Sequence, residues 1–194
     1  VVFYAFNKVE SSVSSTFGKN RNLMNFPVLS VFEMYVSKLI LNVTTMFVIY
    51  HIFLYSHNFF LKNMFPNQII WPEDILRVYE AVLMAGVYGF FVGILNLGIE
   101  VYFPSWSKLY SFVRRAQLLL SGKMFVVDFM PTTVRDVMYW NPLMHAIELG
   151  RSGFYPYYES HTMDLQFFYS SLLLVAVVAL SLEYYARQRL EVES

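Results

Sequence analysis

The chain has 194 residues, of which 57% are hydrophobic, 19% aromatic and only 14% charged, and its formal net charge is zero. These proportions are typical of membrane proteins, and they exclude the strongly basic surface with which proteins bind nucleic acid. The sequence contains no cysteine, which excludes disulfides, thiolate metal sites and cysteine nucleophiles.

The N-terminal part predicts the end of a membrane helix followed by a cytoplasmic loop. Residues 1–6 read VVFYAF, with no initiator methionine and no signal-peptide pattern. We expect them to be the tail of a span whose earlier part is missing, so that the chain is N-terminally truncated. Residues 7–38 mix Ser, Asn and Lys with spaced apolar residues, which predicts short amphipathic helices broken near Gly18 and Pro27.

Four segments are expected to cross a bilayer, whose hydrocarbon core takes about 20 apolar residues in a helix. Three of them contain no formal charge and lie at 39–61, 81–99 and 165–182. The fourth, 109–127, contains three cations. Two of these, Arg114 and Arg115, lie near its start, where long side chains can reach the membrane interface.

Two features inside the predicted spans have more than one interpretation. His51 is expected to make an interior hydrogen bond and His57 to lie at the interface, with a proton relay as the alternative. Gly86, Gly89 and Gly93 have the spacing of small residues that allow close helix packing. Such packing can occur within the bundle or at a dimer interface.

The positions of lysine and arginine predict the orientation. Nine of these 14 residues lie in 7–38, in 100–115 or after residue 182, and five lie elsewhere. Because short cytoplasmic loops retain positive charge, 7–38, 100–115 and the segment after residue 182 are predicted to face the cytosol. Residues 128–162 then form an extracytoplasmic cap before the last span.

The cap segment, 128–162, is too apolar for a plain loop. It predicts two short helices that lie at the outer membrane face or re-enter the membrane. Asn141 followed by Pro142 is typical of a helix start, because asparagine caps the free N–H groups and proline suits the first turn.

Three ionisable residues, His145, Glu148 and Arg151, follow in the second cap helix. His145 and Glu148 are three residues apart and share a helix face. Two ligands do not make a metal site, so we expect a local hydrogen-bond and ion-pair network that includes Arg151. A catalytic or metal-binding role is the alternative.

A fixed pattern runs through residues 118–160 of the chain. It contains a Ser-Gly pair, a Met-Pro pair, an arginine, then Asn-Pro-Leu, histidine, Ile-Glu-Leu and a second arginine. The residues are Ser121, Gly122, Met130, Pro131, Arg135, Asn141, Pro142, Leu143, His145, Ile147, Glu148, Leu149 and Arg151. This pattern resembles the membrane permease subunit of ABC exporters for capsular polysaccharide and O-antigen. Lys123 departs from it, since the family has an apolar or small residue after the Ser-Gly pair.

The resemblance implies one all-α membrane domain over 1–194, a polytopic helix bundle with short interfacial or re-entrant helices before its last span. It implies a multi-pass protein of the bacterial inner membrane that exports a lipid-linked polysaccharide. The permease is expected to pair with a second copy of itself and with ATPase subunits. No phosphate-binding loop occurs in the sequence, so ATP hydrolysis belongs to the partner chain. No catalytic residue, cofactor or metal is expected.

The first loop is the expected contact with the ATPase. A short helix that presents its apolar residues can dock in a groove of the partner, although it can also rest on the membrane surface. The residues of this contact are Asn20, Arg21, Leu23, Met24, Asn25, Phe26 and Pro27.

Arg114 and Arg115 are the expected residues of the transport path. Neighbours on a helix point about 100° apart, so one can line the path while the other meets lipid headgroups. A guanidinium binds phosphate with two parallel hydrogen bonds, which suits a lipid-linked polymer. The alternative is that both arginines only anchor the helix at the membrane interface.

Three competing functions are compatible with part of the pattern. A permease of the same superfamily that exports a drug or lipid is the nearest one. An intramembrane enzyme would use His145, and an ion-driven secondary transporter would need ionisable residues at the centres of the spans.

Overall fold

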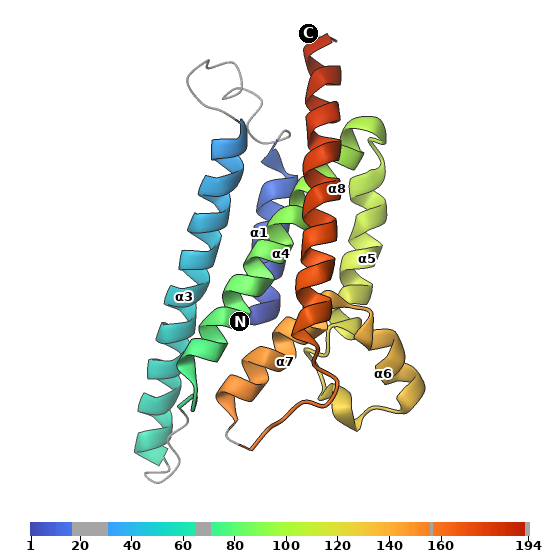
Figure 1. Cartoon of the computed structure of the whole chain (residues 1–194). Helices are drawn as coiled ribbons and strands as arrows, with labels where there is room; N and C mark the ends of the chain where they lie inside the picture. Colours follow the sequence, from blue (N-terminus) through green and yellow to red (C-terminus); the bar gives the residue numbers. More distant parts are fainter. Residues whose placement is uncertain (17–30, 65–70, 156, 193–194) are drawn as a thin grey trace.

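The structure is a computed structural model that describes residues 1–16, 31–64, 71–155 and 157–192, and every regular element in these ranges is helical (Figure 1). The predicted all-α membrane bundle is confirmed. The elements are α1 (Val2–Ser14), α3 (Val31–Met64), α4 (Ile75–Tyr102), α5 (Trp106–Leu120), the 3-10 turn η1 (Val127–Phe129), α6 (Thr132–Tyr139), α7 (Pro142–Phe154) and α8 (Leu165–Val192).

Three of the described helices are long and apolar enough to cross a membrane. They cover Val31–Lys62, Ile75–Tyr102 and Leu165–Arg189. These helices contain the three uncharged segments that the sequence predicts as spans. Each is longer than the predicted segment, because polar residues at its two ends continue the helix beyond the apolar stretch.

Helix α4 lies at the centre of the bundle and contacts α1, α3, α7 and α8. In its apolar segment 67% of the residues are buried inside the protein, against 22% in α3 and 11% in α8. The outer helices α3 and α8 therefore direct most of their apolar surface away from the protein, as helices in contact with lipid do.

The glycines of α4 allow α1 to approach closely. A Cβ atom on Gly89 would lie 2.5 Å from the carbonyl oxygen of Phe6, and one on Gly93 would lie 2.8 Å from Cβ of Val13. At Gly86 the nearest atom is a side-chain carbon of Val43 at 2.7 Å. Of the two interpretations, close packing within the bundle is the one that these contacts support.

The prediction of a loop that begins at residue 7 is wrong. Helix α1 continues to Ser14, and α3 already begins at Val31, so only residues 15–30 of the predicted loop 7–38 lie outside these two helices. The polar residues of NKVESS suggested a loop. The buried residues of α1 nevertheless follow a helical spacing: Phe3, Ala5, Phe6, Val9, Glu10 and Val13.

For the predicted fourth span, 109–127, the expected extent of the helix is wrong. Helix α5 has 15 residues and ends at Leu120, so its length of about 22 Å is less than the ~30 Å of a hydrocarbon core. The chain turns at Gly122, whose φ of +72° suits a residue without a side chain. Because apolar residues lie on both sides of Ser121, no sign of this helix end is present in the sequence.

The short helices α6 and α7 confirm the two predicted cap helices. The side chain of Asn141 accepts a hydrogen bond from the backbone N–H of Leu143 at 3.1 Å, and Pro142 occupies the first turn, as predicted. Gly153 of α7 lies against the start of α4, where its carbonyl accepts a hydrogen bond of 3.0 Å from the backbone of Asp74.

The segments that connect the helices lie at the two ends of the bundle (Figure 1). The start of α3, the turn between α4 and α5 and the end of α8 lie at one end. The helices α6 and α7 and the start of α8 lie at the other. This grouping follows the predicted loops, while the side of the membrane on which each end lies stays a prediction.

Candidate functional site

A buried ion pair joins α5 to α1. Nη2 of Arg114 donates to Oε2 of Glu10 at 2.7 Å, and the side chain of Glu10 is fully buried. The other oxygen of Glu10 accepts a hydrogen bond from Asn96 of α4 at 2.9 Å. Asn96 in turn accepts one from the indole N–H of Trp106 at 3.0 Å. These four residues form the Glu10 network, which connects α1, α4 and α5.

Sequence reasoning missed Glu10 because its surroundings read as a polar loop. An ionised carboxylate in a protein interior needs paired charges and hydrogen bonds to offset its lost hydration. The signal that could have identified it is its position between Phe6, Val9 and Val13 on one helical face. A carboxylate on an apolar helix face requires a cationic partner elsewhere in the fold.

Arg114 and Arg115 line a common cleft. The α1–α5 cleft has a volume of about 280 Å³, and its lining residues are Phe3, Asn7, Ser111, Arg114, Arg115 and Leu118. Arg114 is partly turned into the protein by Glu10, with 38% of its side chain exposed. Arg115 is exposed, and its guanidinium lies 5.9 Å from the centre of the Phe112 ring. Their role in a transport path stays a prediction.

Several polar atoms around the α1–α5 cleft have no hydrogen-bond partner in the described part of the chain. Those of lining residues are Oδ1 of Asn7 and Nε of Arg114, both buried. Oε1 of Gln117, outside the lining, is also buried and without a partner in the described residues. Gln117 lies one turn beyond Arg114 on α5. Buried polar groups are nearly always satisfied in proteins, so these atoms mark a place where further hydrogen bonds can form.

The cap contains a second buried ion pair. Glu148 is fully buried and accepts hydrogen bonds from Arg151 and from the hydroxyl of Tyr158. Arg151 also donates to the carbonyl oxygen of Gly122 at 2.8 Å and to that of Phe125 at 3.3 Å. Burial and the neighbouring carboxylate of Glu148 raise the pKa of Tyr158 to about 12. Arg151 therefore fastens α7 to the turn that follows α5.

His145 belongs to a separate network. Its Nδ1 accepts a hydrogen bond from the backbone N–H of Asp164 at 2.9 Å, and its Nε2 lies 2.9 Å from the carbonyl oxygen of Tyr139. This arrangement assigns the proton to Nε2 of a neutral ring. Burial lowers the pKa of His145, although the Tyr139 carbonyl and the charge of Asp164 oppose the shift.

The predicted network of His145, Glu148 and Arg151 is thus two networks. Glu148 and Arg151 are paired, as expected, but the hydrogen bonds of His145 go to Tyr139 and Asp164. The buried side chains of His145 and Glu148 on α7 therefore contact different parts of the cap. The His145 network holds the cap to the start of α8, and the Glu148–Arg151 network holds it to the turn after α5.

A carboxylate also joins the two ends of the cap segment. Asp128 of η1 accepts hydrogen bonds from the backbone N–H groups of His161 and Thr162, at 3.0 and 3.2 Å. Burial alone raises the pKa of Asp128, but the hydrogen bonds from Thr162 and His161 bring it below its usual value. The charged form of Asp128 therefore stabilises the closed cap.

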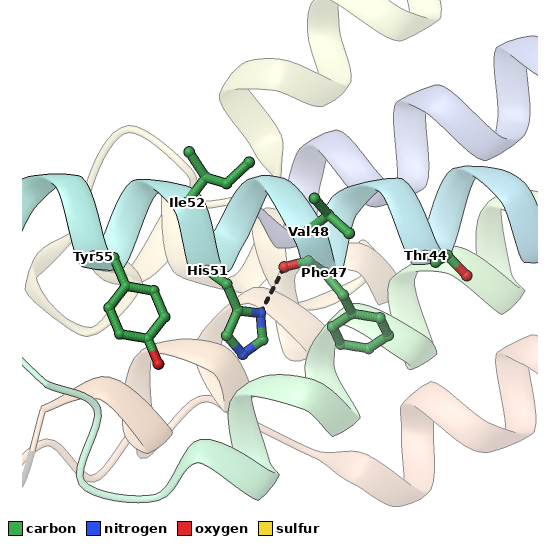
Figure 2. A pocket seen from close by; sticks show the side chains of 6 residues that line it. All are labelled: Thr44, Phe47, Val48, His51, Ile52 and Tyr55. Carbon is green, nitrogen blue, oxygen red and sulfur yellow. Dashed lines mark hydrogen bonds between the residues drawn. The ribbon is translucent and has the colours of Figure 1, made fainter.

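Figure 2 shows a groove on α3 with a volume of about 520 Å³. Its lining residues are Thr44, Phe47, Val48, His51, Ile52 and Tyr55. Nδ1 of His51 lies 2.8 Å from the carbonyl oxygen of Phe47, and its Nε2 lies 2.7 Å from the hydroxyl of Tyr79. The predicted interior hydrogen bond of His51 is confirmed. Both ring nitrogens are hydrogen-bonded within the bundle, so this apolar groove is a weaker candidate site than the α1–α5 cleft.

The predicted ATPase contact lies outside the described residues. It comprises Asn20, Arg21, Leu23, Met24, Asn25, Phe26 and Pro27. Its two flanks are described, and both lie at the end of the bundle where α8 ends (Figure 1).

No family model matches the chain, but several characterised proteins are similar to it. The capsule polysaccharide export inner-membrane protein BexB of Haemophilus influenzae is 23% identical over 84 residues, which are 43% of this chain and 32% of BexB. The polysialic acid transport protein KpsM of Escherichia coli is 21% identical over 188 residues, which are 94% of this chain and 68% of KpsM. The inner-membrane protein CtrC of Neisseria meningitidis, also named for capsule polysaccharide export, is 25% identical over 84 residues.

The match thus spans about a third of the length of BexB and about two thirds of that of KpsM. The resemblance to polysaccharide export permeases that the sequence predicts is confirmed. The predicted multi-pass location in a bacterial inner membrane is confirmed as well, since BexB and CtrC are inner-membrane proteins and three helices here can span a bilayer.

Proposed function

We propose that this chain is the transmembrane subunit of an ATP-driven exporter that moves a lipid-linked polysaccharide across the inner membrane. The observation that carries the proposal is the similarity to KpsM, which extends over 94% of the chain and therefore includes all three apolar helices and the cap. A role in transport rather than catalysis agrees with the cap geometry, because its ionisable residues are engaged in holding helices together.

The proposed exporter contains two copies of the permease and two ATPase subunits. These 194 residues contain no phosphate-binding loop, which supports the proposal that a partner chain hydrolyses the ATP. We place the ATPase contact at residues 20–27, whose flanks α1 and α3 both pack on α4. A force applied between these flanks reaches the centre of the bundle directly, which suits a coupling segment.

The two ends of the bundle take different parts in the proposed transport. Arg114 and Arg115 lie on α5, which begins at the end assigned to the cytosol, and can attract the phosphate of an incoming lipid-linked polymer. The cap, with Asn141, Glu148 and Arg151 among its fixed points, shapes the exit. Export requires at least two conformations that expose the path to opposite sides.

The test has two parts, carried out with the full-length protein. Purification from native membranes under mild detergent is expected to recover an ATPase subunit together with the permease. Deletion of the gene is expected to abolish polysaccharide at the cell surface while the polymer accumulates inside. An isolated permease without an ATPase, or normal surface polysaccharide in the deletion strain, would overturn the proposal. Loss of drug or lipid efflux with normal polysaccharide would favour the nearest competing function.

A further inference from the structure

The α1–α5 cleft combines excess positive charge with unsatisfied polar atoms and apolar walls. Two guanidinium groups and the carboxylate of Glu10 leave one formal positive charge, and the ammonium group of Lys123 lies 4.9 Å from the ring centre of Phe3, another lining residue. In the described part of the chain, Arg115 forms no ion pair. Nε of Arg114 and Oδ1 of Asn7 are buried and without hydrogen-bond partners. Phe3 and Leu118 complete the lining with apolar surface.

We propose that the α1–α5 cleft binds the phosphoryl group of a membrane amphiphile through Arg114 and Arg115, and that Glu10 is an internal counter-ion that competes with this ligand for Arg114. Arginine is suited to this task because its planar fork matches two oxygens of a phosphate. Arg115, which pairs with no carboxylate in the described residues, is the principal ligand. Glu10 is a positioning residue, because it acts through Arg114.

The dimensions of the cleft select a headgroup rather than a whole ligand. Its volume of about 280 Å³ lies below the roughly 300–1,000 Å³ of pockets that enclose a drug-sized molecule. The hydrocarbon part of the amphiphile must therefore lie outside the cleft. The outer face of α5 offers a surface for it, since Phe112 and Leu119 are both exposed.

The competition follows from the hydrogen bonds of Arg114. Nη2 of Arg114 already donates to Glu10 at 2.7 Å, whereas Nε has no acceptor in the described part of the chain. A phosphoryl oxygen that bound to Nε would draw the guanidinium towards the cleft and lengthen its bond to Glu10. Neutralising Glu10 frees the guanidinium, so it should strengthen phosphoryl binding. A purely structural role for Glu10 predicts no such gain.

The test uses the full-length permease in detergent micelles, without its ATPase and without polysaccharide. The bound fraction of added lipid is measured by native mass spectrometry for a polyprenyl phosphate, phosphatidylglycerol and zwitterionic phosphatidylcholine. Arg115→Gln is expected to weaken binding of the two anionic lipids about tenfold or more, as expected when one charge-assisted hydrogen bond is lost. Lys108→Gln, which removes the same charge from α5 outside the cleft, is expected to have no such effect.

The substitutions at Glu10 test the competition itself. Affinity for the anionic lipids is expected to rise from wild type through Glu10→Asp to Glu10→Gln, because the shorter carboxylate holds Arg114 less firmly and the amide does not pair with it. Equal loss in Arg115→Gln and Lys108→Gln would overturn the site. Affinity that falls or stays constant in both Glu10 variants would overturn the counter-ion. If Glu10→Gln does not fold, the comparison of Glu10→Asp with wild type decides.

The source of the phosphoryl group is read from the same titrations. Preference for the polyprenyl phosphate over phosphatidylglycerol would identify the lipid carrier of the polysaccharide, an assignment that rests on the proposed function. Equal binding would identify a general anionic phospholipid and would still support the cleft. No retention of either anionic lipid would overturn the proposal of an amphiphile, and a parallel titration with inorganic phosphate would then show whether the cleft binds a free phosphate instead. Because polysaccharide export is measured separately in cells, its failure is distinguishable from failure of the cleft.

Discussion

Glu10 and Arg114 differ in burial, so removing one or the other is expected to lower the stability of the protein by different amounts. Glu10 is fully buried, whereas 38% of the Arg114 side chain is exposed. Without Arg114, the carboxylate of Glu10 stays buried and keeps the hydrogen bond from Asn96. Without Glu10, the guanidinium of Arg114 can turn to the cleft and its surroundings. The cost of breaking the pair is therefore expected to be unequal for the two substitutions.

Arg114→Gln is expected to lower the free energy of unfolding by about 3 kcal/mol, the lower end of the range for a buried charge left without its partner. Glu10→Gln is expected to lower it by about 1 kcal/mol, and the double variant should recover part of the loss of Arg114→Gln. Denaturant titration in mild detergent measures these values. Arg115→Gln, on the exposed side, serves as a control within about 0.5 kcal/mol of wild type. Equal losses in the two single variants would contradict the asymmetry.

The neutral ring of His145 makes the cap sensitive to acid. Nδ1 accepts the backbone N–H of Asp164, so a proton added there would place two donors against each other. Burial lowers the pKa of His145 below the usual value of a histidine side chain. The unfolded chain therefore binds a proton at a higher pH than the folded protein. Stability is complete above the unfolded pKa and is lost as the pH falls from there through the lowered folded pKa.

The free energy of unfolding should accordingly decrease as the pH falls from about 7 towards about 5, where histidine in unfolded chains titrates. His145→Asn keeps an acceptor towards Asp164 but cannot be protonated. This variant is expected to be about 1 kcal/mol less stable at pH near 7, the net value of one hydrogen bond, and to show a smaller decrease with acid. Denaturation at several pH values compares the two slopes. Identical slopes would show that His145 does not control the acid sensitivity.

At the scale of elements, the contact of α1 with α4 depends on glycine. A Cβ atom at Gly89 would lie 2.5 Å from a backbone oxygen of α1, which cannot move aside as a side chain can. Gly89→Ala is expected to lower the free energy of unfolding by about 2 kcal/mol through overpacking, despite the better helix propensity of alanine. Gly98→Ala is the matched control, because its nearest neighbour is the flexible side chain of Leu182 at 3.0 Å. A melting temperature lowered equally by both substitutions would contradict this explanation.

The sequence predicted those elements whose local signals agree with their packing. The uncharged stretches became α3, α4 and α8, and Asn141 with Pro142 marked the start of α7 correctly. It failed where tertiary contacts override composition. The polar residues of α1 are helical because its apolar face packs on α4. The helical spacing of that face was a local signal, but the polar residues between its members outweighed it. Glu10 was missed with the rest of this segment, and its partner on α5, 104 residues away, could not be identified from the sequence.

Different elements make up the two ends of the bundle (Figure 1). The end with the cap is held by the buried Glu148–Arg151 pair and by the hydrogen bonds of His145 and Asp128. The opposite end carries the flanks of the predicted ATPase contact and the start of α5, next to the Glu10 network. A conformational change that begins at this end therefore acts first on α1 and α5, the two walls of the cleft. This order is expected only if that end faces the cytosol.

The orientation can be tested directly because the chain contains no cysteine of its own. Tyr157 in the cap is 98% exposed, and Ser105 lies exposed in the turn between α4 and α5 at the opposite end. A membrane-impermeant maleimide added to spheroplasts is expected to label Tyr157→Cys, whereas Ser105→Cys should react only after the membrane is permeabilised. The positive charges near Ser105 predict this result, since they retain their loop in the cytosol. The reverse labelling pattern would place the arginines of α5 on the outer side, and the ATPase contact and phosphate entry proposed above would then both be wrong.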